Sequence, residues 1–247
     1  RKNYVKDFIT YMSLFVLAGI LSLGLNAPNI LSTYDYSKYS TRSQSELKLN
    51  PDGTEKEIST GLDYDYITQY SYGIFESLNL IAPRVQGGAS SEDVGEDSDL
   101  YEFLIDNNVP KPQAESFIKS VPTYWGSQPI LEAPAYIGAS IAFLFILSLF
   151  VVKGPFKWWL LISFILSLLL SWGKNFPLLT NLFIDYVPFY NKFRAVSSIQ
   201  VILEFAVPLL AVIGLNKFLA DADLKNIRRS FAIFSVPLII LFLFSGS

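Results

Sequence analysis

The sequence predicts an α-helical polytopic membrane protein with a mixed α/β loop domain outside the membrane. The chain has 247 residues, is 51% hydrophobic and has a mean hydropathy of +0.35, whereas a soluble domain uses roughly 45–50% apolar residues. Most apolar residues lie in five segments that are nearly free of charge, and a membrane span needs about 20 such residues. The charged residues are also unevenly divided along the chain. Together these observations indicate several spans joined by loops of opposite charge.

Each apolar segment predicts one transmembrane helix, at residues 1–24, 136–152, 157–172, 196–219 and 229–247. The first four reach the length of a span when their flanking residues are included. Pro208 predicts a kink in the fourth helix. The fifth segment is apolar to its end, so we expect a truncated helix there and a chain that is a piece of a longer protein.

The distribution of charge predicts which loops face which side of the membrane. Residues 25–135 contain 7 Lys and Arg against 17 Asp and Glu, a balance of −10, and the rest contains 12 against 5, a balance of +7. Because basic residues mark cytoplasmic loops, the acidic, Tyr-rich segment 25–135 is predicted to be extracytoplasmic. The short segment 173–195 is predicted to be an outer interfacial loop with a short helix. Its basic residues make it the exception to this charge rule.

The loop domain at 25–135 is expected to contain both strands and helices. The turn sequence "NPDGT" at 50–54 predicts a β-hairpin, and the apolar spacing over 66–80 predicts a helix. Ser98 and the sequence "PKPQAESF" at 110–117 predict the starts of two further short helices. The acidic, Gly/Ser-rich stretch at 86–100 is interpreted as a solvated, mobile loop.

The chain contains neither Cys nor His, which restricts its chemistry. Disulfides and thiol catalysis are excluded, and the commonest general base and transition-metal ligand is missing. The sequence also lacks a P-loop, a G-x-G-x-x-G, a G-x-S-x-G and an H-E-x-x-H motif, and it has no basic, aromatic-interleaved groove for nucleic acid. Acid–base work therefore has to be done by Asp, Glu, Lys or Tyr.

Candidate catalytic residues lie in the first half of the loop domain. Asp63, Asp65 and Glu76 can act as a general base or bind a divalent metal through oxygen, the one cofactor that the sequence suggests. The alternative is that an aspartate caps the following helix and Glu76 faces water. Tyr72 and Trp125 are candidate stacking platforms for a sugar, and Trp125 has the alternative of an interfacial anchor.

The basic residues of segment 173–195 suggest an anion site. Lys174, Lys192 and Arg194 are its candidate ligands, and the alternative is ordinary snorkelling of long basic side chains at a membrane surface. A short helix between Pro177 and Tyr190 is expected to lie in the interface. Its lipid-facing side chains are predicted to be Leu178, Leu179, Leu182, Phe183 and Val187.

Glu204 lies within the fourth predicted span. An ionisable group at that depth is costly, and it usually faces a cavity or the protein interior. Two interpretations follow: a functional intramembrane carboxylate, or a structural carboxylate that is paired with another helix.

Several phrases together resemble the YfhO-type bacterial membrane proteins. They are "TGLDYDYITQYSYGIFESLNLIAPRVQGG", "VPTYWGSQP" and "LLLSWGKNFPLLTNLFIDYVPFYNKFRAVSSI". This resemblance extends from about residue 60 to residue 220, and its most specific part is P-x-Y-N-K-F-R-A. It implies an architecture like that of the GT-C glycosyltransferases, in the bacterial inner (cytoplasmic) membrane. It also implies that a carboxylate of the first outer loop, before Arg1, acts as base or metal ligand.

The resemblance further implies a partner set and a reaction. The donor would be a sugar carried on polyprenyl phosphate, the acceptor a cell-surface glycopolymer, and the surroundings membrane lipids. Lys174, Lys192 and Arg194 would then contact the donor phosphate. The alternative is a non-catalytic membrane component, such as a lipid-carrier or flippase helper, or a scaffold subunit of a surface-assembly complex. A channel or transporter that uses Glu204 is a third interpretation.

Overall fold

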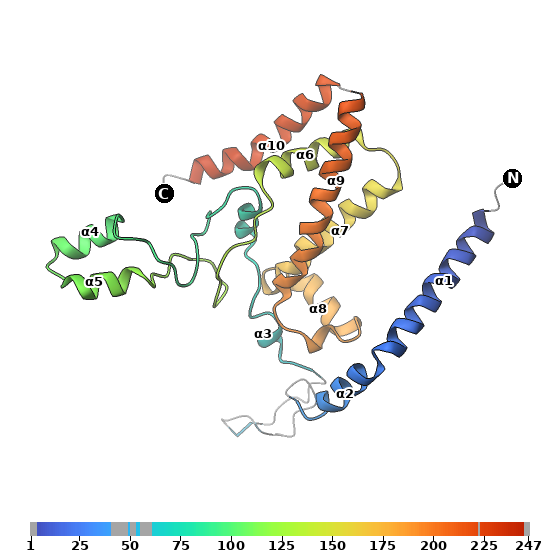
Figure 1. The fold of residues 1–247 in the computed structure, drawn as a ribbon, viewed down its shortest axis with the longest axis horizontal. Helices are drawn as coiled ribbons and strands as arrows, with labels where there is room; N and C mark the ends of the chain where they lie inside the picture. Colours follow the sequence, from blue (N-terminus) through green and yellow to red (C-terminus); the bar gives the residue numbers. More distant parts are fainter. Residues whose placement is uncertain (1–3, 41–48, 50–52, 55–60, 222, 245–247) are drawn as a thin grey trace. The chain divides into compact units, whose positions relative to one another are not determined.

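The computed structural model describes residues 4–40, 49, 53–54, 61–221 and 223–244, and they are mainly helical. The chain divides into two compact units after Asp63. The first unit contains α1 (Tyr4–Leu25) and α2 (Ala27–Ser37). In the second, the α-helices are α3 (Tyr64–Ile67), α4 (Asp99–Asp106), α5 (Lys111–Ile118), α6 (Ala139–Val151), α7 (Pro155–Ser171), α8 (Pro177–Tyr186), α9 (Gln200–Ala220) and α10 (Leu224–Phe244) (Figure 1). Its 3-10 helices are η1 (Phe75–Leu80), η2 (Gly173–Asn175), η3 (Tyr190–Lys192) and η4 (Val196–Ile199).

Helix α1 confirms the first apolar segment as a candidate span. Residues Val5–Leu25 form 21 helical residues with a mean hydropathy of 2.1, and none of this window is buried within the protein. A helix that is apolar on every side has no preferred face to bury against a soluble core. Its composition is therefore the one required for direct exposure to lipid.

The second unit is built on a bundle in which α6 and α7 pack against α9 (Figure 1). Its buried core contains Phe145, Val152, Leu160, Ala206, Val207, Leu210 and Ala211. Small residues bring two of the backbones together, because a Cβ added at Gly214 on α9 would overlap Ser148 on α6. Such contacts are typical of helix pairs that pack in lipid, where close van der Waals approach replaces the hydrophobic driving force.

Helix lengths change the predicted list of spans. Within the described residues, three helices are long and apolar enough to cross a membrane: Val5–Leu25, Val196–Ala220 and Leu224–Leu243. Helix α6 has 13 residues, which extend about 20 Å at 1.5 Å per residue, less than the roughly 30 Å of a bilayer core. The helical part of the predicted span 136–152 is therefore too short to cross alone. Gly138, at φ 105°, delays the start of α6. The predicted fifth span begins earlier than expected, at Leu224, and its residues Leu224–Leu243 are long and apolar enough to cross a membrane.

The expectation of a mixed α/β loop domain is wrong for the part of the chain that the structure describes. No residue there belongs to a sheet strand, and Glu92 and Val121 form an isolated antiparallel bridge. The predicted hairpin at 50–54 lies largely outside the described residues. The two short helices are confirmed: α4 is capped by Ser98, whose Oγ accepts a hydrogen bond from the Tyr101 N–H at 3.3 Å, and α5 covers Lys111–Ile118.

The continuous helix predicted over 66–80 is also wrong. The segment forms α3, an irregular stretch and η1. Its backbone donors leave the helical pattern, because the Tyr72 N–H donates to the Ser171 carbonyl at 2.8 Å and the Gly73 N–H donates to Glu76 Oε2 at 2.9 Å. A carbonyl at the end of α7 and a side chain within the segment thus replace the local i−4 carbonyls that a helix requires.

Candidate functional site

Glu76 is the centre of a buried polar cluster, which we call the polar junction. Its side chain is 0% exposed. Oε1 accepts hydrogen bonds from the Tyr124 hydroxyl at 2.9 Å and from Gln128 Nε2 at 3.1 Å, while Oε2 accepts one from the Gly73 N–H. Both carboxylate oxygens are therefore occupied. The expectation that Glu76 faces water is wrong, and its position is that of a residue that organises the loops.

Two tyrosines of the junction are held in the protonated form. Burial, with a smaller effect of the Glu76 carboxylate, raises the pKa of Tyr124 to about 12, so its hydroxyl remains able to donate to Glu76. Burial also raises the pKa of Tyr72, and the charge of Glu76 adds to this. Tyr72 is 1% exposed, which leaves no ring surface for stacking on an external sugar.

The polar junction joins the 68–76 loop to the end of α7. Ser71 Oγ accepts a hydrogen bond from the Lys174 backbone N–H at 2.9 Å, and Asn175 Nδ2 donates to the Tyr72 carbonyl at 2.9 Å. Gly173 sits between them at φ +48°, where an added Cβ would overlap Ser71 Oγ. These two hydrogen bonds, each between residues 103 positions apart, therefore fix the 68–76 loop to the end of α7.

Arg194 occupies a different setting, on the surface of the second unit. Its guanidinium carbon lies 5.1 Å from the ring centre of Tyr66 and 5.4 Å from that of Tyr70. Its Nη1 donates a hydrogen bond to the Tyr66 hydroxyl at 2.9 Å. The side chain is exposed, and none of the ion pairs among the described residues involves it. We call Arg194, Tyr66 and Tyr70 the arginine site.

The other predicted anion ligands lie in the same region of the sequence. Lys174 is exposed in η2, directly after α7, and Lys192 is half-buried in η3, two residues before Arg194. Arg194 is the one of the three that belongs to the arginine site. The expected short helix is confirmed as α8, between these basic residues.

The two predicted catalytic aspartates are exposed. Asp65 lies in the first turn of α3, next to Tyr66 of the arginine site. Asp63 is the last residue of the first unit. Among the described residues, no group of three or more Asp, Glu, His or Cys side chains is arranged to hold a metal ion.

Trp125 and Glu204 are both exposed. Trp125 is 81% exposed, and its backbone N–H donates to the Gln86 carbonyl at 3.1 Å, which leaves the indole free to serve either as a sugar platform or as an interfacial anchor. Glu204 lies on the side of α9 that faces away from the core. None of the ion pairs among the described residues involves Glu204.

An apolar cavity of about 280 Å³ lies near the polar junction, between η1 and the α6–α7–α9 bundle. It is lined by Ser77, Leu80, Ile81, Ile137, Ala142, Phe145, Ile146, Phe164, Leu168 and Val207. Its one polar side chain, Ser77, already accepts a hydrogen bond from Trp172 Nε1 at 2.8 Å. A cavity of this kind favours a hydrocarbon occupant, since an apolar cavity of about 150 Å³ stays dry and binds benzene.

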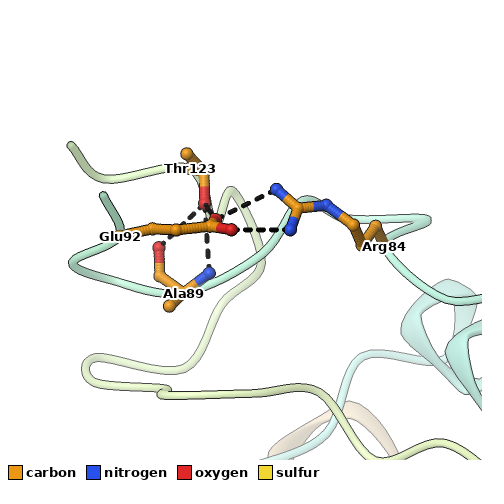
Figure 2. Close-up of polar contacts among 4 residues, drawn as sticks. All are labelled: Arg84, Ala89, Glu92 and Thr123. Carbon is orange, nitrogen blue, oxygen red and sulfur yellow. Dashed lines mark hydrogen bonds and ion pairs between the residues drawn. The ribbon is translucent and has the colours of Figure 1, made fainter. Parts of the chain in front are cut away.

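The sequence analysis missed an ion pair in the loop that it interpreted as solvated and mobile (Figure 2). Arg84 donates to both carboxylate oxygens of Glu92, at 2.7 and 3.0 Å, and the Thr123 hydroxyl donates to the same carboxylate. These bonds lower the pKa of Glu92 to about 2, with Arg84 as the main cause. The sequence feature that could have indicated this contact is the pair Gly87–Gly88. A glycine is needed at position 88 because a Cβ there would overlap the Glu92 carboxylate.

Comparison with protein-family models, with curated proteins and with solved structures found no match for this chain.

Proposed function

We propose that this protein is a membrane glycosyltransferase, or a protein similar to one. It would use a sugar donor carried on polyprenyl phosphate, at the outer face of a bacterial inner membrane, and modify a cell-surface glycopolymer. The observation that carries the proposal is the arginine site. The rings of Tyr66 and Tyr70 and the Tyr66 hydroxyl hold an exposed guanidinium in place, and it has no carboxylate partner among the described residues.

The geometry of Arg194 suits a phosphate. A guanidinium offers five N–H donors in a planar fork that matches two phosphate oxygens, and the one described hydrogen bond, to the Tyr66 hydroxyl, is made by Nη1. The tyrosine rings add cation–π attraction. They also order the side chain before a ligand arrives, which lowers the entropic cost of binding.

Two further features support the same proposal. The apolar cavity at the junction end of the bundle offers volume for part of a hydrocarbon chain. Asp65 is exposed and adjacent in the sequence to Tyr66 of the arginine site, and we assign it the role of acting on the acceptor. Glu76 is assigned a positioning role instead, because its oxygens are already bonded.

The test is binding of a short prenyl phosphate, farnesyl phosphate, to the protein in lipid nanodiscs, together with a transfer assay on the full-length protein. Arg194→Ala should abolish both, and Arg194→Lys should weaken both, since Lys lacks the planar fork. Lys153→Ala, in the exposed turn at the opposite end of α6 and α7, is the matched control and should change neither. Wild-type binding and transfer in Arg194→Ala would overturn the proposal, and full activity of Arg194→Lys would favour simple snorkelling.

A non-catalytic membrane component is the second candidate, and the burial of Glu76 favours it. One of the three expected catalytic carboxylates is 0% exposed and fully hydrogen-bonded. A lipid carrier or scaffold subunit would bind farnesyl phosphate through Arg194 and yet transfer no sugar. Loss of transfer in Asp65→Asn, with phosphate binding unchanged, would exclude this candidate.

A further inference from the structure

The surface of α8 is divided lengthwise into three rows. Leu178, Leu182 and Tyr186 follow one another at four-residue spacing and are 78%, 50% and 80% exposed. Residues at this spacing lie on one face of a helix. They form what we call the apolar row.

The second row is polar. Asn181 and Asp185 are again four residues apart, and both are exposed. Their row lies beside the apolar row, because residues three apart are also neighbours on a helix surface, as Leu178 and Asn181 are. The exposed side of α8 thus changes from apolar to polar across its width.

The third row fixes α8 to the protein. Thr180 is 0% exposed, and its hydroxyl donates to the Gly173 carbonyl at 2.8 Å. Phe183 packs against Tyr190 with 5.5 Å between ring centres. Because these contacts set the rotation of the helix about its axis, the apolar row is held outward by the fold.

Two aromatic residues after α8 add to the exposed apolar surface. Phe189 is 71% exposed and Phe193 is 63% exposed. Phe189, at φ 67°, is the residue before η3, so the chain turns there directly after α8. Together with the apolar row, these rings form an exposed apolar surface that extends beyond the end of α8.

The position of α8 in the chain favours the bilayer as the surface that covers these apolar residues. The helix begins six residues after the end of α7 at Ser171, and the candidate span Val196–Ala220 begins ten residues after its last residue, Tyr186 (Figure 1). It therefore precedes, by a short connection, a helix that is long and apolar enough to cross a membrane. Exposed Lys174 and Arg194 flank it in the sequence, as expected near lipid phosphates.

We propose that α8 is an interfacial anchor that lies in the plane of the membrane surface. The apolar row, with Phe189 and Phe193, is buried at the boundary between headgroups and acyl chains, and the polar row faces water. This arrangement is that of an amphipathic interfacial helix. The proposal goes beyond the proposed function, because it requires no sugar donor, no acceptor and no turnover.

The absence of Cys from the chain allows a direct test by site-directed spin labelling. Single variants Leu178→Cys and Leu182→Cys on the apolar row, and Asn181→Cys and Asp185→Cys on the polar row, are labelled with a nitroxide. The labelled proteins are reconstituted in lipid nanodiscs. All four positions are exposed, so the four substitutions are comparable and should not disturb the core. Thermal unfolding of each variant checks that the fold is retained.

The measurement compares collision of each label with oxygen, which concentrates in lipid, and with a water-soluble nickel chelate. We expect the ratio of oxygen to nickel collisions to be several-fold higher on the apolar row than on the polar row. Equal ratios at all four positions would overturn the proposal. Protection of the apolar row from both reagents would also overturn it, since a protein surface would then cover α8. Neither result depends on whether Arg194 binds a phosphate.

Discussion

The polar junction and the arginine site place similar residue types in opposite settings. In the junction, Glu76 is 0% exposed and accepts three hydrogen bonds, one of them from a tyrosine. In the arginine site, Arg194 is exposed, and its described neighbours are two tyrosines. A buried carboxylate whose oxygens already accept hydrogen bonds has no access to an external ligand, so its role is structural. An exposed and ordered guanidinium remains able to bind a ligand. The difference separates residues that position the loops from residues that meet a ligand.

The largest effect is expected from breaking the junction. Glu76→Ala leaves the Tyr124 hydroxyl, the Gln128 amide and the Gly73 N–H without their acceptor, at about 1–3 kcal/mol for each buried group. We expect a loss of about 3 kcal/mol or more in the free energy of unfolding, measured by thermal unfolding in detergent. Glu76→Gln keeps one acceptor oxygen and should lose less.

Asp65→Ala is the surface control for this prediction. Asp65 is exposed, so its removal should change the free energy of unfolding by less than about 0.5 kcal/mol. An unfolding temperature of Glu76→Ala equal to that of the wild type would contradict the structural role of the junction.

A smaller loss of stability is expected at the turn that joins the junction to α7. Gly173→Ala places a Cβ against Ser71 and Val196 at a residue with φ +48°, so overpacking should cost about 1–3 kcal/mol. Gly19→Ala in α1 is the matched control, because nothing lies within 4 Å of its added Cβ. Equal unfolding temperatures for the two variants would show that the turn tolerates a side chain.

Tyr66→Phe tests the other side of the comparison. The variant keeps the ring beside Arg194 and removes the hydroxyl that accepts its hydrogen bond. We expect farnesyl phosphate to bind about fivefold more weakly, equivalent to about 1 kcal/mol for one lost hydrogen bond, with unfolding unchanged. A Tyr66→Phe variant that unfolds earlier but binds normally would assign the arginine site to structure.

The smallest effect is expected at the Arg84–Glu92 ion pair. Its side chains are 56% and 28% exposed, so both residues are less buried than Glu76 and are already paired, unlike Arg194. The pKa of Glu92 is lowered from 4.5 to about 2, so its pair contributes stability above pH 4.5 that is lost as the pH falls toward about 2. Arg84→Gln removes the main cause and should return the pKa towards 4.5. Carboxyl-carbon NMR of Glu92 measures this directly, and an unchanged titration in Arg84→Gln would contradict the assignment.

Local features were predictable from the sequence because their causes are local. The Ser98 cap and the start of α5 depend on residues within one helical turn, and both were predicted. The apolar segments were located for the same reason, although α6 starts later than expected because Gly138 adopts φ 105°. The three-row division of α8 was only partly predicted. Phe183, expected to face lipid, packs on Tyr190 instead.

Contacts across the chain were not predictable in the same way. The helix expected over 66–80 is interrupted because its backbone bonds to the end of α7, and no pattern within the segment reports on that partner. The alternative that Glu76 faces water failed for the same reason, since its hydrogen-bond partners Tyr124 and Gln128 are 48 and 52 positions away.

The sequence by itself determined that this chain has apolar helices joined by charged loops, and that its 247 residues include neither Cys nor His. Length and hydropathy are properties of a segment, so no folded partner is needed to define them. Only the tertiary structure decided which charges are buried and which remain exposed. Tyr66 and Arg194 are 128 residues apart, and the free energy of a charged group depends on the neighbours and the solvent that the complete fold provides.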